Sequence, residues 1–105
     1  MSVIVTDTGF GPDDWTAEIL DLTSDSEPSH DMLEAPLIRV DFPSFADGRG
    51  FTIAQRLRLM GYKGRLRASG HVLADQYAMA RRVGFDEVEI SDDLAARQPQ
   101  AHWHS

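Results

Sequence analysis

The stretch that decides the fold reads Asp41-Phe42-Pro43-Ser44-Phe45-Ala46-Asp47-Gly48-Arg49-Gly50. An apolar run over residues 37–42 stops at Pro43, and a helical pattern begins directly after Gly50. Between them, a loop presents Asp47 and Arg49. A strand passes into a helix in this way in α/β proteins, and ligand-contacting groups gather at such junctions. The stretch therefore predicts an α/β fold and marks a candidate site.

Residues 37–90 read as two strand–helix units and a closing strand. Gly61 and Gly84 stand where helix C-terminal caps are expected. Strands that alternate with helices imply right-handed crossovers and a parallel βαβαβ sheet. We expect strands over residues 37–42, 65–69 and 87–90, and helices over residues 51–60 and 72–83.

Each expected strand alternates apolar and charged residues. In the first, Ile38 and Val40 share one face, while Arg39 and Asp41 share the other. A sheet covered by helices on both faces would carry continuous apolar runs instead. The pattern predicts helices packed on one face and a charged opposite face, as in a partial (half) TIM-type barrel. The later strands add Arg65, Arg67, Glu87 and Glu89 to that charged face.

The 105 residues form one expected α/β domain, 1–105. Its acidic N-terminal part, residues 1–36, carries expected strands at 2–6 and 19–22 and a short helix at 28–33. The tail at 98–105 has no pattern and is expected to be mobile.

Composition excludes several classes of protein. The absence of cysteine rules out disulfides and thiol chemistry within this chain. No apolar stretch approaches the roughly 18 residues of a membrane span, and the N-terminus lacks the pattern of a signal peptide. With a net charge of −7 and no nucleic-acid-binding motif, the chain is expected to be cytoplasmic, with no nucleic acid, membrane or metal partner.

Charge is segregated along the chain. Residues 1–36 carry nine acids and no Lys or Arg, whereas residues 37–84 carry nine bases and three acids. One interpretation is that these segments neutralise one another within the fold. The other is that the basic centre binds an anion or an acidic partner.

The charged sheet face has three interpretations. It can be a ladder of ion pairs that satisfies the face, with each pair contributing roughly 0.2–1 kcal/mol. It can be an anion site, with Arg67 beside Asp41 as the expected functional residues. It can also be a surface through which two copies associate as a homo-oligomer.

The loops at the strand ends offer further candidates. Asp47, Gly48, Arg49 and Gly50 either contact a ligand or simply close the turn, with Asp47 paired to Arg49. His71 and Asp75 either form an acid–base pair or a helix cap beside a solvated histidine. The tail histidines, His102 and His104, lack evident partner ligands for a metal. The Asp13-Asp14-Trp15 cluster either anchors a partner or pins the N-terminal segment to the core.

The sequence also resembles a bacterial family of unknown function. The resemblance covers residues 37–90 and rests on Asp41-Phe42-Pro43, Phe45, Asp47-Gly48-Arg49-Gly50-Phe51, Gly61-Tyr62-Lys63-Gly64, Leu66-Arg67-Ala68-Ser69-Gly70, Asp75-Gln76 and Arg82-Val83-Gly84-Phe85-Asp86. That family is labelled an oxidoreductase and is encoded beside sulfite reductase in sulfur-assimilation operons. Many of its members carry an acid where His71 stands, and its N-terminal third is longer.

The resemblance implies a protein that assists assimilatory sulfite reduction. It points to sulfite reductase as a partner. From the residues themselves, we expect the anion or partner site around Arg67, Asp41 and Arg49. The candidate residues are Asp41, Asp47, Gly48, Arg49, Gly50, Arg67, His71, Asp75 and Gln76.

Two alternatives stay open. The first is a small enzyme, an oxidoreductase by the family label, with its site at the strand C-terminal ends. Because no flavin or nicotinamide fingerprint is visible, no cofactor is expected. The second is a half-barrel that self-associates. The residues leave open whether the protein is an enzyme.

Overall fold

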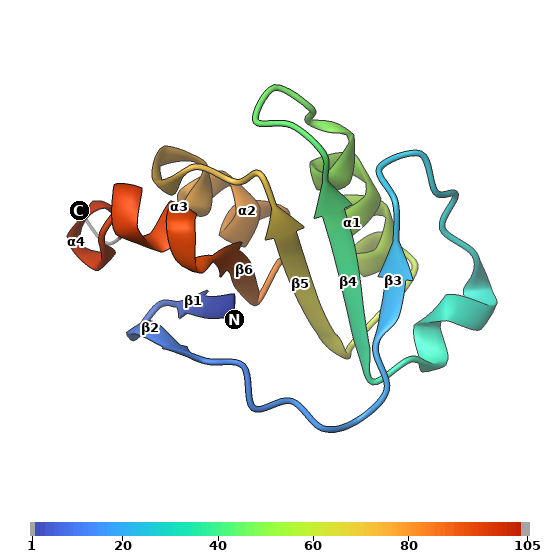
Figure 1. Ribbon diagram of the computed structural model, residues 1–105. Coiled ribbons are helices and arrows are strands. Elements are labelled where there is room, and N and C mark those ends of the chain that lie inside the picture. Colours follow the sequence, from blue (N-terminus) through green and yellow to red (C-terminus); the bar gives the residue numbers. More distant parts are fainter. Residues whose placement is uncertain (1, 104–105) are drawn as a thin grey trace.

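A computed structural model describes residues 2–103 and contains one six-stranded sheet (Figure 1). Its strand order is β2-β1-β6-β5-β4-β3. The strands are β1 (Ser2–Thr6), β2 (Gly9–Pro12), β3 (Leu20–Leu22), β4 (Leu37–Phe42), β5 (Arg65–Gly70) and β6 (Glu87–Ser91). The α-helices are α1 (Arg49–Leu59), α2 (Tyr77–Val83), α3 (Asp92–Arg97) and α4 (Gln100–Trp103), and two short 3-10 helices are η1 (His30–Glu34) and η2 (Ala74–Gln76).

The four strands from β3 to β6 are parallel and lie in chain order. β1 pairs with β6 and β2 pairs with β1, both antiparallel. The predicted α/β fold and its βαβαβ core are therefore confirmed. The sheet is open, with β2 and β3 at its ends, and the likeness to a half barrel stays a prediction.

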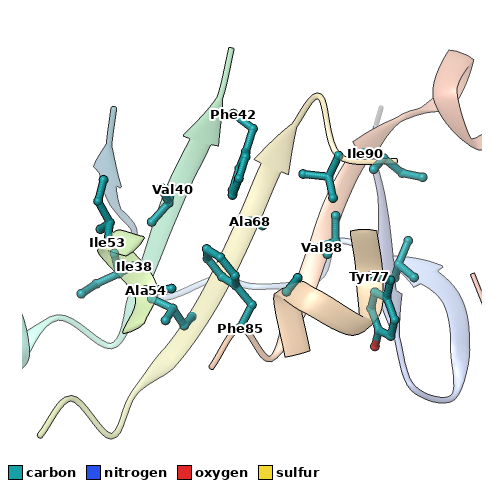
Figure 2. Packing of buried hydrophobic residues seen from close by; sticks show 14 of the residues in the cluster. Ile38, Val40, Phe42, Ile53, Ala54, Ala68, Tyr77, Phe85, Val88 and Ile90 are labelled. Atoms are coloured by element: carbon teal, nitrogen blue, oxygen red, sulfur yellow. The ribbon is translucent and has the colours of Figure 1, made fainter. Parts of the chain in front are cut away.

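The core lies between the sheet and its helices (Figure 2). Val40 and Phe42 from β4, Ala68 from β5 and Val88 from β6 are all buried on this side. They meet the apolar side chains of α1 and α2, among them Ile53, Ala54, Leu57, Tyr77 and Ala80. The apolar positions of the alternating strands thus form the helix-covered face, as their period of two predicts.

The second helix begins later than its sequence pattern predicts, at Tyr77 rather than near residue 72. Gln76 Oε1 accepts a hydrogen bond from the Leu73 backbone N–H at 2.8 Å, and Gln98 Oε1 accepts one from the Ala74 N–H at 2.6 Å. Side chains that take up backbone donors compete with regular helical bonding. The segment therefore forms the 3-10 turn η2 before α2 begins.

The secondary structure near the two chain ends differs from the sequence-based expectation more than that of residues 37–90 does. β2 is an additional strand that forms a hairpin with β1, and the expected helix at 28–33 is the 3-10 helix η1. The expected mobile tail contains α4, where the buried Trp103 ring stands edge-on to Tyr77 with centroids 6.1 Å apart. Its Nε1–H donates to the Gln98 carbonyl oxygen at 2.8 Å, so this side chain is anchored in the core. His104 lies outside the described residues.

Among the described residues, no helix combines the length and the apolar character that crossing a membrane requires.

Candidate functional site

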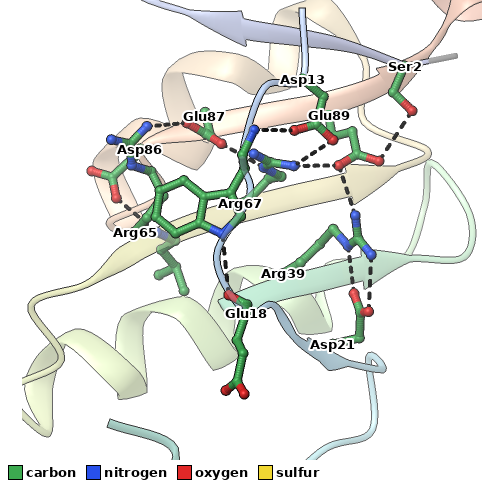
Figure 3. A network of polar contacts seen from close by, with 12 residues as sticks. Ser2, Asp13, Glu18, Asp21, Arg39, Arg65, Arg67, Asp86, Glu87 and Glu89 are labelled. Atoms are coloured by element: carbon green, nitrogen blue, oxygen red, sulfur yellow. Dashed lines mark hydrogen bonds and ion pairs between the residues drawn. The ribbon is translucent and has the colours of Figure 1, made fainter. Parts of the chain in front are cut away.

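The charged sheet face is centred on Arg67, a buried residue of β5 (Figure 3). Register places Arg67 between Arg39 of β4 and Glu87 of β6. Its Nε donates to Glu87 Oε2 at 2.6 Å, and its Nη1 donates to Glu89 Oε1 at 2.8 Å. Burial opposes the charged guanidinium, but the bonds to Glu89 and Glu87 outweigh it and raise the pKa of Arg67. Arg67 is therefore held as a paired cation.

Arg39 extends the network toward β3. Its Nε and Nη2 donate to the two Asp21 carboxylate oxygens at 2.6 and 3.0 Å, and its Nη1 donates to Glu89 Oε1 at 3.1 Å. Hydrogen bonds to Asp21 raise the pKa of Arg39. Such bidentate pairs fix both side chains in place. On the other side of Arg67, Arg65 Nη1 donates to Glu87 Oε1 at 2.8 Å.

A segment between β2 and β3, residues 13–18, lies over this face and is here called the strap. Asp13 Oδ2 is 3.3 Å from Arg67 Nη1, and the Arg65 guanidinium carbon is 5.6 Å from the centre of the Trp15 ring. The Asp13-Asp14-Trp15 cluster thus holds the N-terminal part of the chain against the sheet.

These contacts match the interpretation of the face as a self-satisfying ladder. Among residues 2–103, no buried side-chain nitrogen or oxygen lacks a hydrogen-bond partner. Ion pairs such as Asp21–Arg39 and Asp13–Arg67 also join the acidic N-terminal part to the basic centre. The segregated charges therefore neutralise one another within the fold.

The loop between β4 and α1 is closed by a local ion pair. Asp47 accepts from the Arg49 backbone N–H at 3.0 Å and from its guanidinium at 2.7 to 3.3 Å. These bonds lower the pKa of Asp47 below its usual range. Arg49 Nη2 also donates to Ser24 Oγ at 2.9 Å, which ties the loop to the turn after β3.

The two glycines of this loop differ in their surroundings. A Cβ on Gly50 would lie 2.5 Å from the Phe42 ring, whereas one on Gly48 would approach nothing closer than 3.9 Å. Gly50 thus lets the first turn of α1 rest on the end of β4, and Gly48 has no such constraint.

The C-terminal ends of the parallel strands form a second surface, here called the strand-end edge and made of Asp41, Phe45, Gly70, His71 and the start of α3. The Phe45 ring is 40% exposed and stands edge-on to the His71 ring, with centroids 5.0 Å apart. His71 Nδ1 lies 3.2 Å from the Phe42 carbonyl oxygen. The exposed Asp41 carboxylate has no hydrogen bond or ion pair within residues 2–103.

This edge borders a cavity of about 300 Å³. Its lining comes from the loop after β4, the end of β5, the end of β6 and α3. The lining residues are Phe45, Gly70, His71, Ser91, Asp93, Leu94 and Arg97.

The remaining predicted residues support the edge rather than line it. Gln76 Nε2 donates to the Phe45 carbonyl oxygen at 3.1 Å and so holds the loop after β4. Asp75 is exposed in η2, and none of the described contacts joins it to His71, so the acid–base pair stays one of two alternatives for these residues.

The structure separates the predicted site into two parts. Asp41 is opposite Ser69, two residues beyond Arg67 along β5, and no ion pair joins Asp41, Arg49 and Arg67. Sequence reasoning missed the part of the cavity that comes from α3. Ser91 followed by Asp92 and Asp93 is a helix-start signal, and the Leu94 N–H indeed donates to Ser91 Oγ at 3.1 Å.

Within residues 2–103, no three His, Cys, Asp or Glu residues gather in a way that could hold a metal ion.

The family model described as "Bacterial protein of unknown function (DUF934)" matches residues 19–105. The searches of curated proteins and of solved structures found no match. Because the matched residues make up most of the chain, this protein belongs to the DUF934 family of bacterial proteins of unknown function.

Proposed function

We propose that this protein is an accessory factor of assimilatory sulfite reduction and that it binds sulfite reductase through the strand-end edge. The assignment to this pathway rests on the resemblance of residues 37–90 to a family whose members are encoded beside sulfite reductase. The binding surface rests on the geometry of the edge.

The observation that carries the proposal is the exposed Phe45 ring beside His71. Gln76 holds the Phe45 backbone in place, so the ring is presented from a fixed loop. Aromatic side chains are enriched in the cores of protein interfaces, where a preorganised anchor costs little entropy to bind. The unpaired Asp41 carboxylate on the same edge supplies a polar contact for the rim.

The two arginines first considered for an oxyanion, Arg49 and Arg67, lie outside the strand-end edge and are already paired with carboxylates. The Arg49 guanidinium is already bonded to Asp47, and Arg67 already contacts Glu87, Glu89 and Asp13. An incoming oxyanion would have to compete with these carboxylates for the same donors. An apolar anchor such as Phe45 has no such competitor.

Capture of purified sulfite reductase on immobilised protein tests the proposal. We expect Phe45→Ala to weaken capture by at least tenfold, the loss typical of an interface anchor. Leu59→Ala is the matched control, because Leu59 is 82% exposed at the end of α1, away from the edge. Failure of the wild-type protein to capture the reductase, or equal capture by both variants, would contradict the proposal.

A small enzyme at the same edge is the second candidate. Active sites of parallel α/β sheets lie beyond the C-terminal ends of the strands, where Asp41 carries a free carboxylate. Absorbance and native mass spectrometry of the purified protein distinguish this candidate from the first. A stoichiometric bound redox cofactor would favour the enzyme.

Self-association through the charged face is physically less favourable. Its guanidinium and carboxylate groups already pair within one chain, and the strap lies over part of it. Light scattering that shows a dimer sensitive to substitution of Arg39 would restore this interpretation.

A further inference from the structure

The strap and the β1–β2 hairpin enclose a small cavity against the sheet. Its volume is about 190 Å³, and its lining shares no residue with that of the strand-end cavity. Arg65 and Arg67 of β5 and Glu87 of β6 supply the sheet side. Every other lining residue comes from the first 15 residues of the chain. The cavity therefore exists because the N-terminal segment folds over the ladder.

The lining carries two arginines and two acids, and the two acids differ in their pairing. Glu87 on β6 already pairs with both Arg65 and Arg67 of β5, whereas Asp14 stands on the strap and has no described pairing with either arginine. A simple anion would be attracted by the arginines and repelled by the two acids. A simple cation would be attracted by the acids and repelled by the arginines. A ligand that carries both charges complements such a lining.

Two charged groups in the lining have unused hydrogen-bonding capacity. Arg65 donates one described side-chain hydrogen bond, to Glu87, whereas a guanidinium carries five N–H donors. The Asp14 carboxylate makes no hydrogen bond or ion pair in the part of the chain that the structure describes. The Trp15 indole stands beside Arg65 and provides an apolar wall.

We propose that this cavity binds a small zwitterionic α-amino acid. The Arg65 guanidinium binds the carboxylate of the amino acid, and Asp14 accepts hydrogen bonds from its ammonium group. The cavity is smaller than the roughly 300–1,000 Å³ of sites for drug-sized ligands, so the side chain must be short. This site is independent of the proposed binding of sulfite reductase.

Most of the lining precedes the matched part of the family, which begins at residue 19. The proposed site therefore combines Arg65 of the matched part with Asp14, which lies before it.

Trp15 provides a direct reporter. The chain has two tryptophans, so Trp103→Phe leaves Trp15 as the only tryptophan, whose emission can be excited selectively over that of tyrosine. L-Serine is the probe, glycerate replaces its ammonium with a hydroxyl, and ethanolamine lacks its carboxylate. We expect serine to change the Trp15 emission with saturation, and both analogues to bind at least about tenfold more weakly.

Variants of the two charged groups complete the test. Asp14→Asn and Arg65→Gln should each weaken serine binding about tenfold, whereas Glu34→Gln, an exposed acid outside the cavity, should not. Calorimetric titration of the wild-type protein repeats the measurement without the Trp103 substitution. Any of three results would overturn the proposal. The first is equal binding of serine and its two analogues, and the second is serine binding that neither Asp14→Asn nor Arg65→Gln weakens. The third is that none of the small amino acids glycine, alanine, serine, cysteine and threonine binds.

Discussion

Arg67 and Glu87 form a buried ion pair in the middle of the sheet, with Nε and Oε2 2.6 Å apart and both side chains only 3% exposed. The pair joins β5 to β6 at register positions directly opposite each other. Removing one partner of a buried pair leaves the other charge less compensated, although here Arg67 keeps Glu89 and Glu87 keeps Arg65.

We therefore predict a non-additive double-mutant cycle for this pair. Arg67→Met and Glu87→Leu should each lower the free energy of unfolding by about 2 kcal/mol or more, because each removes a buried hydrogen bond between charged groups while Arg67 keeps Glu89 and Glu87 keeps Arg65. The double variant should recover at least about 1 kcal/mol relative to the sum of the single changes, because both single changes break the same 2.6 Å contact. Urea unfolding measures all four free energies, and additive effects would contradict the assignment.

Gly50 and Gly48 provide a matched test of the contact between α1 and β4. Gly50→Ala should cost about 1–3 kcal/mol of stability, because its Cβ would lie 2.5 Å from the buried Phe42 ring. Gly48→Ala should change the free energy of unfolding by less than about 0.5 kcal/mol, since its Cβ meets no close neighbour. Thermal unfolding that ranks the two variants equally would show that the helix does not rest on Phe42.

Tyr77 makes stability fall at alkaline pH. Burial and the hydrogen bond that its hydroxyl donates to Asp7 at 2.6 Å raise the pKa of Tyr77 above its ordinary value of 10.0. Because the folded state favours the protonated form of Tyr77, this residue's full contribution to the free energy of unfolding is present below about pH 10. The contribution is lost as the pH rises from there through the pKa of Tyr77 in the folded state.

Tyr77→Phe should therefore flatten this alkaline decline. Between pH 10 and 11.5, the slope of unfolding free energy against pH should become shallower by up to about 1.4 kcal/mol per unit. Below pH 9, the variant should be less stable by about 1 kcal/mol, because the bond to Asp7 is lost. Urea unfolding at each pH measures both quantities, and identical slopes for the two proteins would contradict this account.

The strands β4, β5 and β6 and the helix α1 could be predicted because their signals are local. Apolar and charged side chains alternate at Ile38, Arg39 and Val40, and this alternation indicates directly which residues lie on each face of the sheet. The helix ends are marked by Gly61 and Gly84, which adopt positive φ. The chain ends could not be predicted in the same way. Trp103 is held by a hydrogen bond to Gln98 and by packing against Tyr77, and these tertiary contacts leave no periodic pattern in so short a segment.

The charged side chains illustrate the same limit at the candidate site. Sequence alternation placed Arg67 and Asp41 on one face, but only the register shows that Arg67 is opposite Glu87 while Asp41 is opposite Ser69. The exposure of Phe45 depends on the Gln76 side chain, 31 residues away. The strap could not be placed from sequence because its position depends on Asp13 and Trp15 contacting a distant strand.

Growth of a deletion strain tests the central claim most directly. If the protein assists sulfite reduction through the strand-end edge, the strain should grow poorly on sulfate and normally on cysteine. The wild-type and Leu59→Ala genes should restore growth on sulfate, whereas Phe45→Ala should not. Normal growth of the deletion strain on sulfate would contradict the claim.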